Sequence, residues 1–303
     1  MHLVVTGGAG FIGNHLVRHL LSKGHSVEII DNLHSGKMEN LQGLENQIKF
    51  HKIDILEYDK LRDIVKNVDG VFHEAALTVV QESFVKPKEY HMVNVVGTEN
   101  IFKLAKEFGF KVVYASSSSV YGNPEKIPIT EDAVRRPLNP YGETKLQDEL
   151  LAEKYSLDGV TIIGLRYFNV YGKGQTSSYA GVITKFLERL RENQPPIING
   201  DGSQVRDFVY VEDVAKANIL AMEKKINSSF INVGTGKIIS ILELANMMID
   251  VANIQLKPIH GKTLEGDVKE SQADVGLAKK LLDWKAEMEL QDWLAKILVP
   301  KKF

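Results

Sequence analysis

One stretch near the start of the chain decides its fold: Leu3-Val4-Val5-Thr6-Gly7-Gly8-Ala9-Gly10-Phe11-Ile12-Gly13. Its apolar start predicts a strand, and the helical spacing of apolar residues over 14–23 predicts a helix. Glycines between them let the backbone turn tightly and leave the N–H groups at the helix start facing a negative charge. The order predicts a pyrophosphate site, with candidate contacts at Gly7, Gly10, Phe11, Ile12 and Gly13.

The next strand supports a dinucleotide site. It is expected over Ser26 to Ile30, and it ends in Asp31 and Asn32. In dinucleotide-binding folds a carboxylate at about this distance from the glycine turn contacts the adenosine ribose hydroxyls. Because a carboxylate repels a 2′-phosphate, we predict NAD rather than NADP as the cofactor, with Asp31 and Asn32 among its contacts.

The bulk composition argues against several other classes of protein. A chain of 303 residues is long enough for about two domains or one large α/β unit. The net charge of −2 and scattered lysines offer no basic face for nucleic acid. With no cysteine there is no disulfide or zinc–thiolate site. No apolar run spans a bilayer and no signal peptide is recognisable, so we expect a cytoplasmic protein without a membrane partner.

Two histidines raise the question of a metal. His15 and His19 lie one helical turn apart, but no carboxylate joins them at a spacing typical of metal ligands. We therefore expect no metal site, and we expect this pair to lie on a solvated helix face.

Strands and helices alternate along the first half of the chain. We expect strands at 48–53, 70–73, 111–115 and 160–165, and helices at 59–66, 87–108 and 141–156. This alternation predicts right-handed crossovers and an α/β fold with a doubly wound parallel sheet of the Rossmann type. We expect a dinucleotide-binding domain at 1–170, to which 207–236 returns, and a smaller mixed α/β substrate lobe at 171–206 and 237–303.

Two polar groups are candidates for chemistry. Tyr141 is followed four positions later by Lys145, which places both on one helix face. A tyrosine with an ordinary pKa of about 10 needs a nearby cation to lose its proton near neutrality, so the pair is a candidate general base. The alternative is an exposed aromatic ring beside a solvated lysine. The run Ser116 to Ser119 follows an inner strand, where one hydroxyl can relay a proton to Tyr141.

Eight motifs together resemble the extended short-chain dehydrogenase/reductases, and within them the UDP-sugar 4-epimerases. They are T-G-G-A-G-F-I-G (6–13), D-N-L (31–33), H-E-A-A (73–76), S-S-S-S-V-Y-G (116–122), Y-G-E-T-K (141–145), R-Y-F-N-V-Y-G (166–172), R-D-F-V-Y-V-E-D-V-A (206–215) and G-D-V-K-E-S-Q-A-D (266–274). Their order and spacing make the resemblance specific over nearly the whole chain. It implies an NAD-dependent isomerase that acts on a UDP-hexose and forms a homodimer through helices 88–108 and 141–156.

The resemblance also implies roles for individual residues. The catalytic residues are Ser117, Tyr141 and Lys145; Tyr141 and Lys145 also contact the cofactor, and Ser117 also contacts the substrate. Further cofactor contacts are Asp54, Ile55, Ala75 and Asn94, which lies beside the pyrophosphate. On the substrate side, Asn169 matches the amide that meets the diphosphate, and Arg206 matches the guanidinium that grips it. Ser271 matches a gatekeeper beside the sugar C2 substituent, where a small side chain leaves room for an N-acetyl group.

Two positions depart from the pattern of the bacterial UDP-galactose epimerases. Leu264 stands where these enzymes have a second arginine, and Thr78 stands where they have a lysine. Either part of the grip on the diphosphate comes from another residue, for which Lys262 is a candidate, or the nucleotide is held differently.

Three other functions stay open. A UDP-glucuronate 4-epimerase, or another nucleotide-sugar epimerase or dehydratase, would use the same fold and cofactor. A 4,6-dehydratase is disfavoured because Ser118 and Ser119 occupy the positions of its Asp-Glu pair. A non-catalytic NAD-binding protein would have no need for the serine, tyrosine and lysine together.

Overall fold

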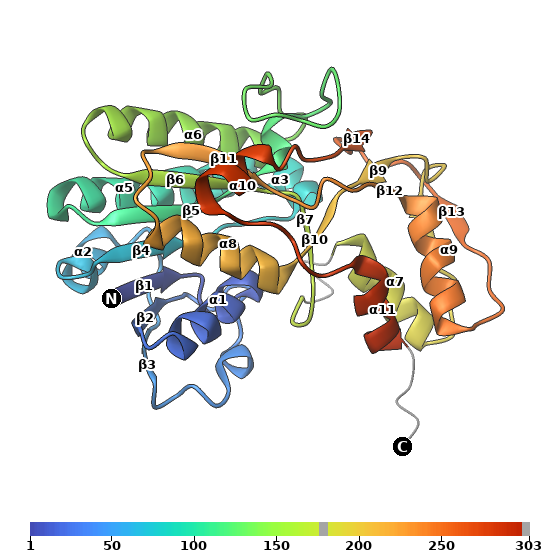
Figure 1. Cartoon of the computed structure of the whole chain (residues 1–303), viewed down its shortest axis with the longest axis horizontal. Helices are drawn as coiled ribbons and strands as arrows, with labels where there is room; N and C mark the ends of the chain where they lie inside the picture. The colour runs from blue at the N-terminus through green and yellow to red at the C-terminus, as the bar shows by residue number, and fades with distance from the viewer. Residues whose placement is uncertain (176–180, 299–303) are drawn as a thin grey trace.

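A parallel sheet of seven strands forms the centre of the molecule. The computed structural model of the chain describes residues 1–175 and 181–298. The strand order is β11-β6-β5-β4-β1-β2-β3 (Figure 1). The strands are β1 (His2–Thr6), β2 (Ser26–Ile30), β3 (Ile48–His51), β4 (Gly70–His73), β5 (Lys111–Ser117), β6 (Ile162–Tyr167) and β11 (Ser229–Val233). The predicted α/β fold with a Rossmann-like sheet is confirmed.

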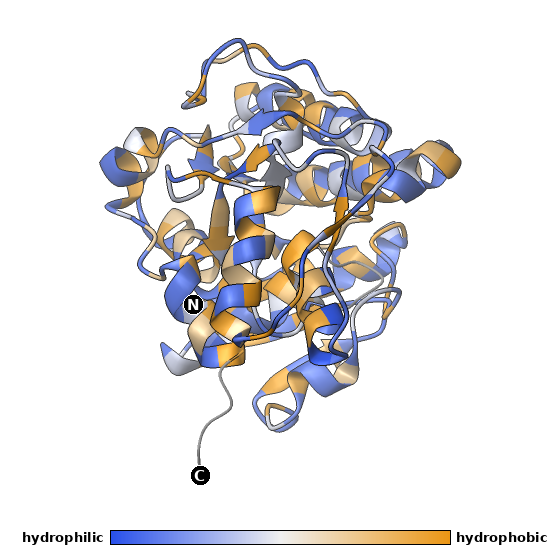
Figure 2. Cartoon of the chain, turned by 90° about the vertical axis from the view of Figure 1, so that its right-hand side faces the viewer, coloured by the Kyte–Doolittle hydropathy of each residue, from blue (hydrophilic) through white to orange (hydrophobic). Residues whose placement is uncertain are grey.

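Helices cover both faces of this sheet. One face carries α1 (Phe11–Ser22), α8 (Val211–Glu223) and α10 (Gly276–Leu282), and the other carries α2 (Tyr58–Val65), α5 (Gly97–Phe108) and α6 (Pro140–Leu157). Figure 2 shows hydrophobic and hydrophilic residues interleaved along the helices. This is the pattern of helices that bury one side against a sheet and expose the other.

Most of the second half of the chain forms a lobe with its own core. Phe186, Leu244 and Trp293 are buried in this core. The helices are α7 (Val182–Arg191), α9 (Ile241–Ala252) and α11 (Leu290–Leu298), which lie on the right of Figure 1. The small sheets pair β7 (Asn169–Tyr171) with β10 (Phe208–Tyr210), β8 (Ile197–Asn199) with β13 (Ile259–Gly261), and β9 (Val205–Arg206) with β12 (Ile239–Ser240) and β14 (Glu270–Ser271).

The two cores divide the chain differently from the predicted boundaries in two places. Phe208, expected in the first domain, packs in the core of the lobe. Leu282 and Trp284, expected in the lobe, pack in the core beside α1 and α8, and the Trp284 indole donates a hydrogen bond to the Asp213 carbonyl (2.9 Å). Residues 176–180 and 299–303 of the predicted lobe lie outside the described residues.

The predicted helix from Pro87 to Phe108 consists of three consecutive elements. These are α4 (Pro87–Tyr90), a π-helical segment η2 (His91–Val96) and α5. The wider turn of a π-helix changes which residues face inward. As a result Asn94 and Val95 are buried, while Val93 and Val96, which an ideal helix would bury, are half-buried.

Short elements complete the described chain. They are η1 (Met38–Leu41), α3 (Val80–Val85) and η3 (Ser118–Val120). Among the helices of residues 1–175 and 181–298, none is long and apolar enough to cross a bilayer.

The expectation of a solvated pair at His15 and His19 is wrong. His15 is buried, because α1 packs against α8 and brings Glu212 between the two imidazoles. The Glu212 carboxylate contacts His15 Nδ1 (2.7 Å) and His19 Nε2, and His15 Nε2 contacts the Lys173 carbonyl (2.8 Å). These histidines therefore join the first helix to α8 and to the segment that enters the lobe.

Candidate active site

A cavity of about 650 Å³ lies where the carboxyl ends of the sheet strands meet the lobe. Gly7, Asp31, Glu74 and Ser118 reach it from the ends of four strands, and Arg206 reaches it from the lobe. The strand order reverses on either side of β1, and open α/β sheets bind ligands at such a point. The volume falls in the range of small-molecule sites, roughly 300–1,000 Å³.

In the glycine turn, the backbone passes so close to neighbouring backbone atoms that only glycine fits at Gly7 and Gly13. Gly7 has a φ of +69°, and a Cβ there would lie 2.7 Å from the Ala75 nitrogen. A Cβ at Gly13 would lie 2.2 Å from the Gly7 carbonyl oxygen. Helix α1 begins directly after the turn, with no side-chain cap and no acidic residue in its first turn. Its first N–H groups therefore suit an anion at the cavity wall.

Side chains at the ends of β2 and β3 line the same cavity as the glycine turn. The Asp31 carboxylate accepts hydrogen bonds from the Ala9 N–H (3.0 Å) and the Leu33 N–H (2.8 Å). Burial raises the pKa of Asp31, and these two hydrogen bonds oppose the shift. Each oxygen keeps a lone pair for a ligand hydroxyl. Asn32 Nδ2 donates to Asp54 Oδ2 (2.8 Å), and Ile55 and Ala75 complete this part of the wall.

Replacing Asp31 with asparagine is expected to weaken NAD binding and to reduce discrimination against NADP. The change removes the charge that repels a 2′-phosphate and one acceptor for the ribose hydroxyls. We expect the ratio of NADP to NAD dissociation constants to fall by about tenfold or more, the size of one charge-assisted contact. Calorimetric titration of cofactor-free protein with each dinucleotide measures this ratio. Equal weakening for both cofactors would contradict the role of the charge.

The start of α6 holds the tyrosine and lysine predicted as a general base. The helix begins here because Asn139 caps it, accepting from the Gly142 N–H (2.8 Å), and Pro140 suits its first position. Lys145 is 3% exposed, and its Nζ lies 3.2 Å from Asp148 Oδ2. Burial lowers the pKa of Lys145, but the charge and hydrogen bond of Asp148, together with the electrostatic interaction with Tyr141, outweigh burial and raise it.

The serine run lies against the same helix start. A Cβ at Gly142 would lie 2.8 Å from the Ser119 carbonyl oxygen, so α6 and the run are in close contact. Ser117 ends β5, and its hydroxyl donates to Ser119 Oγ (2.9 Å) and accepts from the Ser119 N–H (3.1 Å). Ser118 and Ser119 line the cavity, whereas Ser117, Tyr141 and Lys145 are not among its lining residues. The choice of Ser117 as catalytic serine stays a prediction.

Asn94 does not line the cavity, although the resemblance implied a place beside the pyrophosphate. It is fully buried in η2. Its side chain accepts from the Leu77 N–H (2.8 Å) and donates to the Leu77 carbonyl (3.0 Å) and to Thr144 Oγ1 (3.0 Å). Because Leu77 lines the cavity, Asn94 fixes a part of the wall and ties it to α6.

Of the four predicted substrate residues, Asn169, Arg206 and Ser271 line the cavity, whereas Ser117 is not among its lining residues. Asn169 lies at the start of β7, where its Nδ2 donates to the Asp207 carbonyl (3.1 Å). Arg206 is buried and forms an ion pair with Asp267. Ser271 lies opposite Arg206 in the parallel pairing of β14 with β9.

The departures from the family pattern also lie on the wall. Leu264 and Thr78 both line the cavity, but Lys262 is not among its lining residues. The single lysine of the described chain that lines it is Lys185, in the first turn of α7. Lys185 belongs to none of the eight motifs, so the sequence did not predict it.

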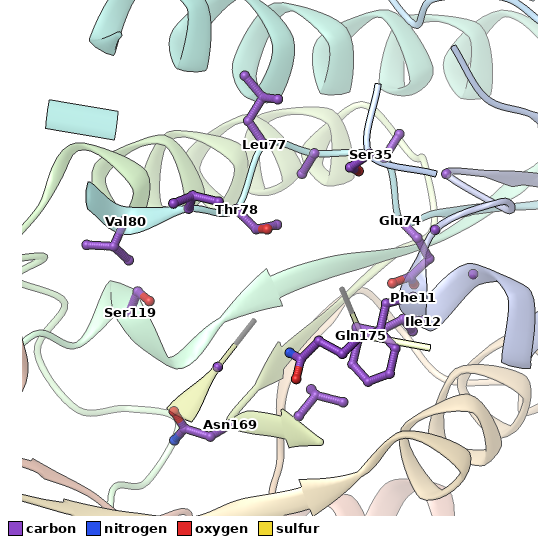
Figure 3. Close-up of a pocket in the computed structure, with 18 of the residues that line it drawn as sticks. Phe11, Ile12, Ser35, Glu74, Leu77, Thr78, Val80, Ser119, Asn169 and Gln175 are labelled. Atoms are coloured by element: carbon purple, nitrogen blue, oxygen red, sulfur yellow. The ribbon is translucent and has the colours of Figure 1, made fainter. Parts of the chain in front are cut away.

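Glu74 is a further residue on the cavity wall, to which the sequence analysis assigned no role although it belongs to the motif H-E-A-A (73–76). Figure 3 shows its side chain close to Phe11 and Ile12, with Ser119, Val80 and Asn169 across the cavity. The Tyr167 hydroxyl donates to Glu74 Oε1 (2.9 Å), and Oε2 has no hydrogen-bond partner among the described residues. Burial raises the pKa of Glu74 to about 7. The signals in the sequence are its place in the motif H-E-A-A and at the end of an inner strand.

Comparison with known proteins agrees with this geometry. The model of the NAD-dependent epimerase/dehydratase family matches residues 3–234. The chain belongs to this family. It is 38% identical to a putative UDP-glucose 4-epimerase of Methanocaldococcus jannaschii, over 98% of this chain and 97% of that one.

Solved structures of the epimerase/dehydratase family share the whole fold. A UDP-N-acetylglucosamine 4-epimerase from Methanobrevibacter ruminantium, in complex with UDP-N-acetylmuramic acid, superposes with a TM-score of 0.93 at 37% identity, covering 98% of this chain and 96% of that one. A UDP-glucuronic acid 4-epimerase from Bacillus cereus, with UDP-glucuronic acid and NAD, has a TM-score of 0.91 at 33% identity, covering 97% and 96%.

Proposed function

We propose that this chain is an NAD-dependent 4-epimerase of UDP-hexoses. The substrates are UDP-glucose and UDP-galactose, with the N-acetylated pair UDP-GlcNAc and UDP-GalNAc admitted by the small side chain of Ser271. One observation carries the proposal: a single cavity joins the glycine turn and Asp31 to Arg206, Asn169 and Ser271, next to the start of α6. The relatives described above are enzymes of the same kind.

The residues present fit NAD. The uncapped start of α1 suits a pyrophosphate, and Asp31 offers acceptors to a ribose at the end of β2. When bound, the nicotinamide supplies a reversible acceptor for the hydride at C4 of the sugar.

The chain supplies proton transfer and orientation. Tyr141 takes the proton of the C4 hydroxyl, with Lys145 favouring the phenolate and Ser117 holding the hydroxyl by a hydrogen bond. Arg206 and Asn169 hold the diphosphate. The 4-keto sugar turns about the bond that joins it to the diphosphate, and so presents its opposite face to the nicotinamide site. Tyr141 then returns the proton to the C4 oxygen. No net oxidation occurs, so the product is the C4 epimer.

A UDP-glucuronate 4-epimerase is the second candidate. The similarity to the Bacillus cereus enzyme, whose structure contains UDP-glucuronic acid, favours it. Proton NMR distinguishes the candidates when purified protein is incubated without added cofactor with UDP-glucose, UDP-N-acetylglucosamine or UDP-glucuronate. Inversion at C4 of either hexose supports our proposal. Inversion of the uronate alone would establish the second candidate, and no inversion even with added NAD would leave a binding role.

Replacing Ser271 with tyrosine is expected to reduce activity on the N-acetylated sugars selectively. Ser271 is 6% exposed at the cavity wall, so a phenol ring there fills the space available to an acetamido group. We expect kcat/KM for UDP-N-acetylglucosamine to fall by about 100-fold, and that for UDP-glucose by less than about threefold. Parallel kinetics on the two sugars measure the difference. Equal losses would refute the gatekeeper role.

Assembly and location are further parts of the proposal. We infer a homodimer that pairs α5 and α6 across an axis. Exposed leucines on α6 support this, since Leu150 is 50% and Leu157 is 91% exposed. Sedimentation of the purified chain measures its mass. We also infer that the protein is cytoplasmic. Its binding partners are then nucleotide-sugar substrates, and neither nucleic acid nor a membrane is among them.

A further inference from the structure

Asp148 is a buried carboxylate that touches the proposed catalytic lysine. It follows Lys145 by three residues on α6, so the two side chains share one face of the helix. Lys145 Nζ lies 3.2 Å from Asp148 Oδ2, and the two side chains are 3% and 0% exposed. Asp148 Oδ1 has no hydrogen-bond partner among the described residues. The mechanism above does not use this group.

We propose that Asp148 is a positioning residue that holds the Lys145 ammonium and offsets its charge, and so sets the pH at which the pair of Tyr141 and Lys145 loses its first proton. The inference rests on the proposed function, in which this pair is the general base.

Charge alone gives the direction of the effect. The protonated pair can lose its first proton from the tyrosine or from the lysine. Either loss makes the pair more negative by one charge, and a buried anion nearby opposes both. Removing the anion therefore lowers the pH of this first loss, whichever of the two groups releases the proton.

The other charged groups around the pair do not replace this anion. Glu149 is matched by Arg166 and Arg135, which contact its two oxygens (2.8 and 2.9 Å). Burial lowers the pKa of His73 to about 3, so it is neutral. Burial also raises the pKa values of Tyr90, Tyr114 and Tyr167, which are neutral too. Glu74 is the second buried carboxylate that interacts with Lys145, and Asp148 is the one in contact with it.

The ionisation of Asp148 agrees with this role. Burial raises its pKa to about 7, although Lys145 acts in the opposite direction. The carboxyl is therefore charged above about pH 7 and becomes neutral as the pH falls below that value. The charge of Asp148 therefore acts on the pair above about pH 7. There it moves the acid limb of the native pH profile to higher pH than in a protein without this charge.

The pH profile of Asp148→Asn tests the proposal. The substitution keeps the size of the side chain and removes its charge. We expect the acid limb of kcat/KM to move to lower pH by about one unit. One unit below the native midpoint, the native enzyme then keeps about a tenth of its limiting rate and the variant keeps about half, a fivefold difference. Glu143→Gln is the matched control, because Glu143 is an exposed carboxylate on the same helix, and its limb should stay within about 0.2 units.

A second measurement tests the proposal even if Asp148→Asn has no measurable activity. Tyrosinate absorbance is titrated in four proteins: native, Tyr141→Phe, Asp148→Asn and the double variant. The contribution of Tyr141 is the difference between each protein and its Tyr141→Phe counterpart. If Asp148→Asn is inactive, this contribution must appear at lower pH than in the native protein. If the variant does not fold, Asp148→Ser removes the same charge and leaves room for water.

The outcomes separate the two proposals. An acid limb that stays in place or moves upward in active Asp148→Asn overturns the role of Asp148, while native turnover leaves the proposed function intact. A native protein without turnover on any nucleotide sugar overturns the proposed function. The tyrosinate titration then still decides whether Asp148 acts on the pair, and an unchanged Tyr141 titration overturns it.

Discussion

Tyr141→Phe is expected to lower kcat for C4 inversion by about 10³-fold or more while the protein still binds NAD. The hydroxyl removed is the group to which we assign the proton of the C4 oxygen, and a positioned general base contributes roughly 10²- to 10⁴-fold. The ring stays at the start of α6, so the fold should be retained. Proton NMR of UDP-glucose measures the rate, and the dinucleotide released on denaturation measures bound NAD.

The control for this variant lies on the same helix. Tyr155 is buried about four turns further along α6, and its hydroxyl contacts Glu99 Oε1 (3.2 Å), away from the cavity. Tyr155→Phe should leave kcat within about twofold, as expected for a residue outside the site. A Tyr141→Phe protein that turns over at the native rate would sink the assignment of the base, and loss of NAD from it would show a defect in cofactor binding instead.

The sheet and the nucleotide end of the cavity could be predicted because local rules determine them. A glycine turn between a strand and a helix has few possible shapes, and a carboxylate at the end of the next strand must lie at the same sheet edge. Asp31 and the turn glycines accordingly lie on one cavity. Asn94 could not be placed in this way, because the π-helical segment changes the direction in which side chains point along that helix.

Helix α6 shows why the catalytic region was harder to predict. It buries Lys145, Asp148 and Glu149 and exposes Leu150 and Leu157. Hydrophobic periodicity assigns apolar residues to the inside and charged residues to the outside, so it fails on such a helix. The buried charges find partners from β6 and within α6, which are contacts of the tertiary structure. The sequence pattern identifies the motif Y-x-x-x-K, but it does not show that the buried carboxylate of Asp148 contacts the lysine of this motif.

Arg166→Met is expected to destabilise the protein by about 3–5 kcal/mol. Arg166 opens the motif R-Y-F-N, yet it is 2% exposed and lies in the core between β6 and α6. Its Nε and Nη2 each contact Glu149 (both 2.8 Å), and its Nη1 donates to the Tyr121 hydroxyl (2.7 Å) and the Glu131 carbonyl (2.8 Å). Methionine fills part of the volume but leaves a buried carboxylate short of its main cation. Urea unfolding followed by circular dichroism measures the change.

The cost should come from the stranded carboxylate rather than from the lost arginine alone. Glu149 Oε1 also accepts from Ser116 Oγ (2.7 Å), so the same carboxylate ties α6 to the strand that carries the serine run. Replacing Glu149 with glutamine in the Arg166→Met background should therefore recover about 1–2 kcal/mol, since it removes the unpaired charge. Arg135→Met, which removes the more exposed cation from the same carboxylate, should cost about 1 kcal/mol or less. If the Arg135 and Arg166 variants lose equal stability, the buried pair is not what fixes α6 against the sheet.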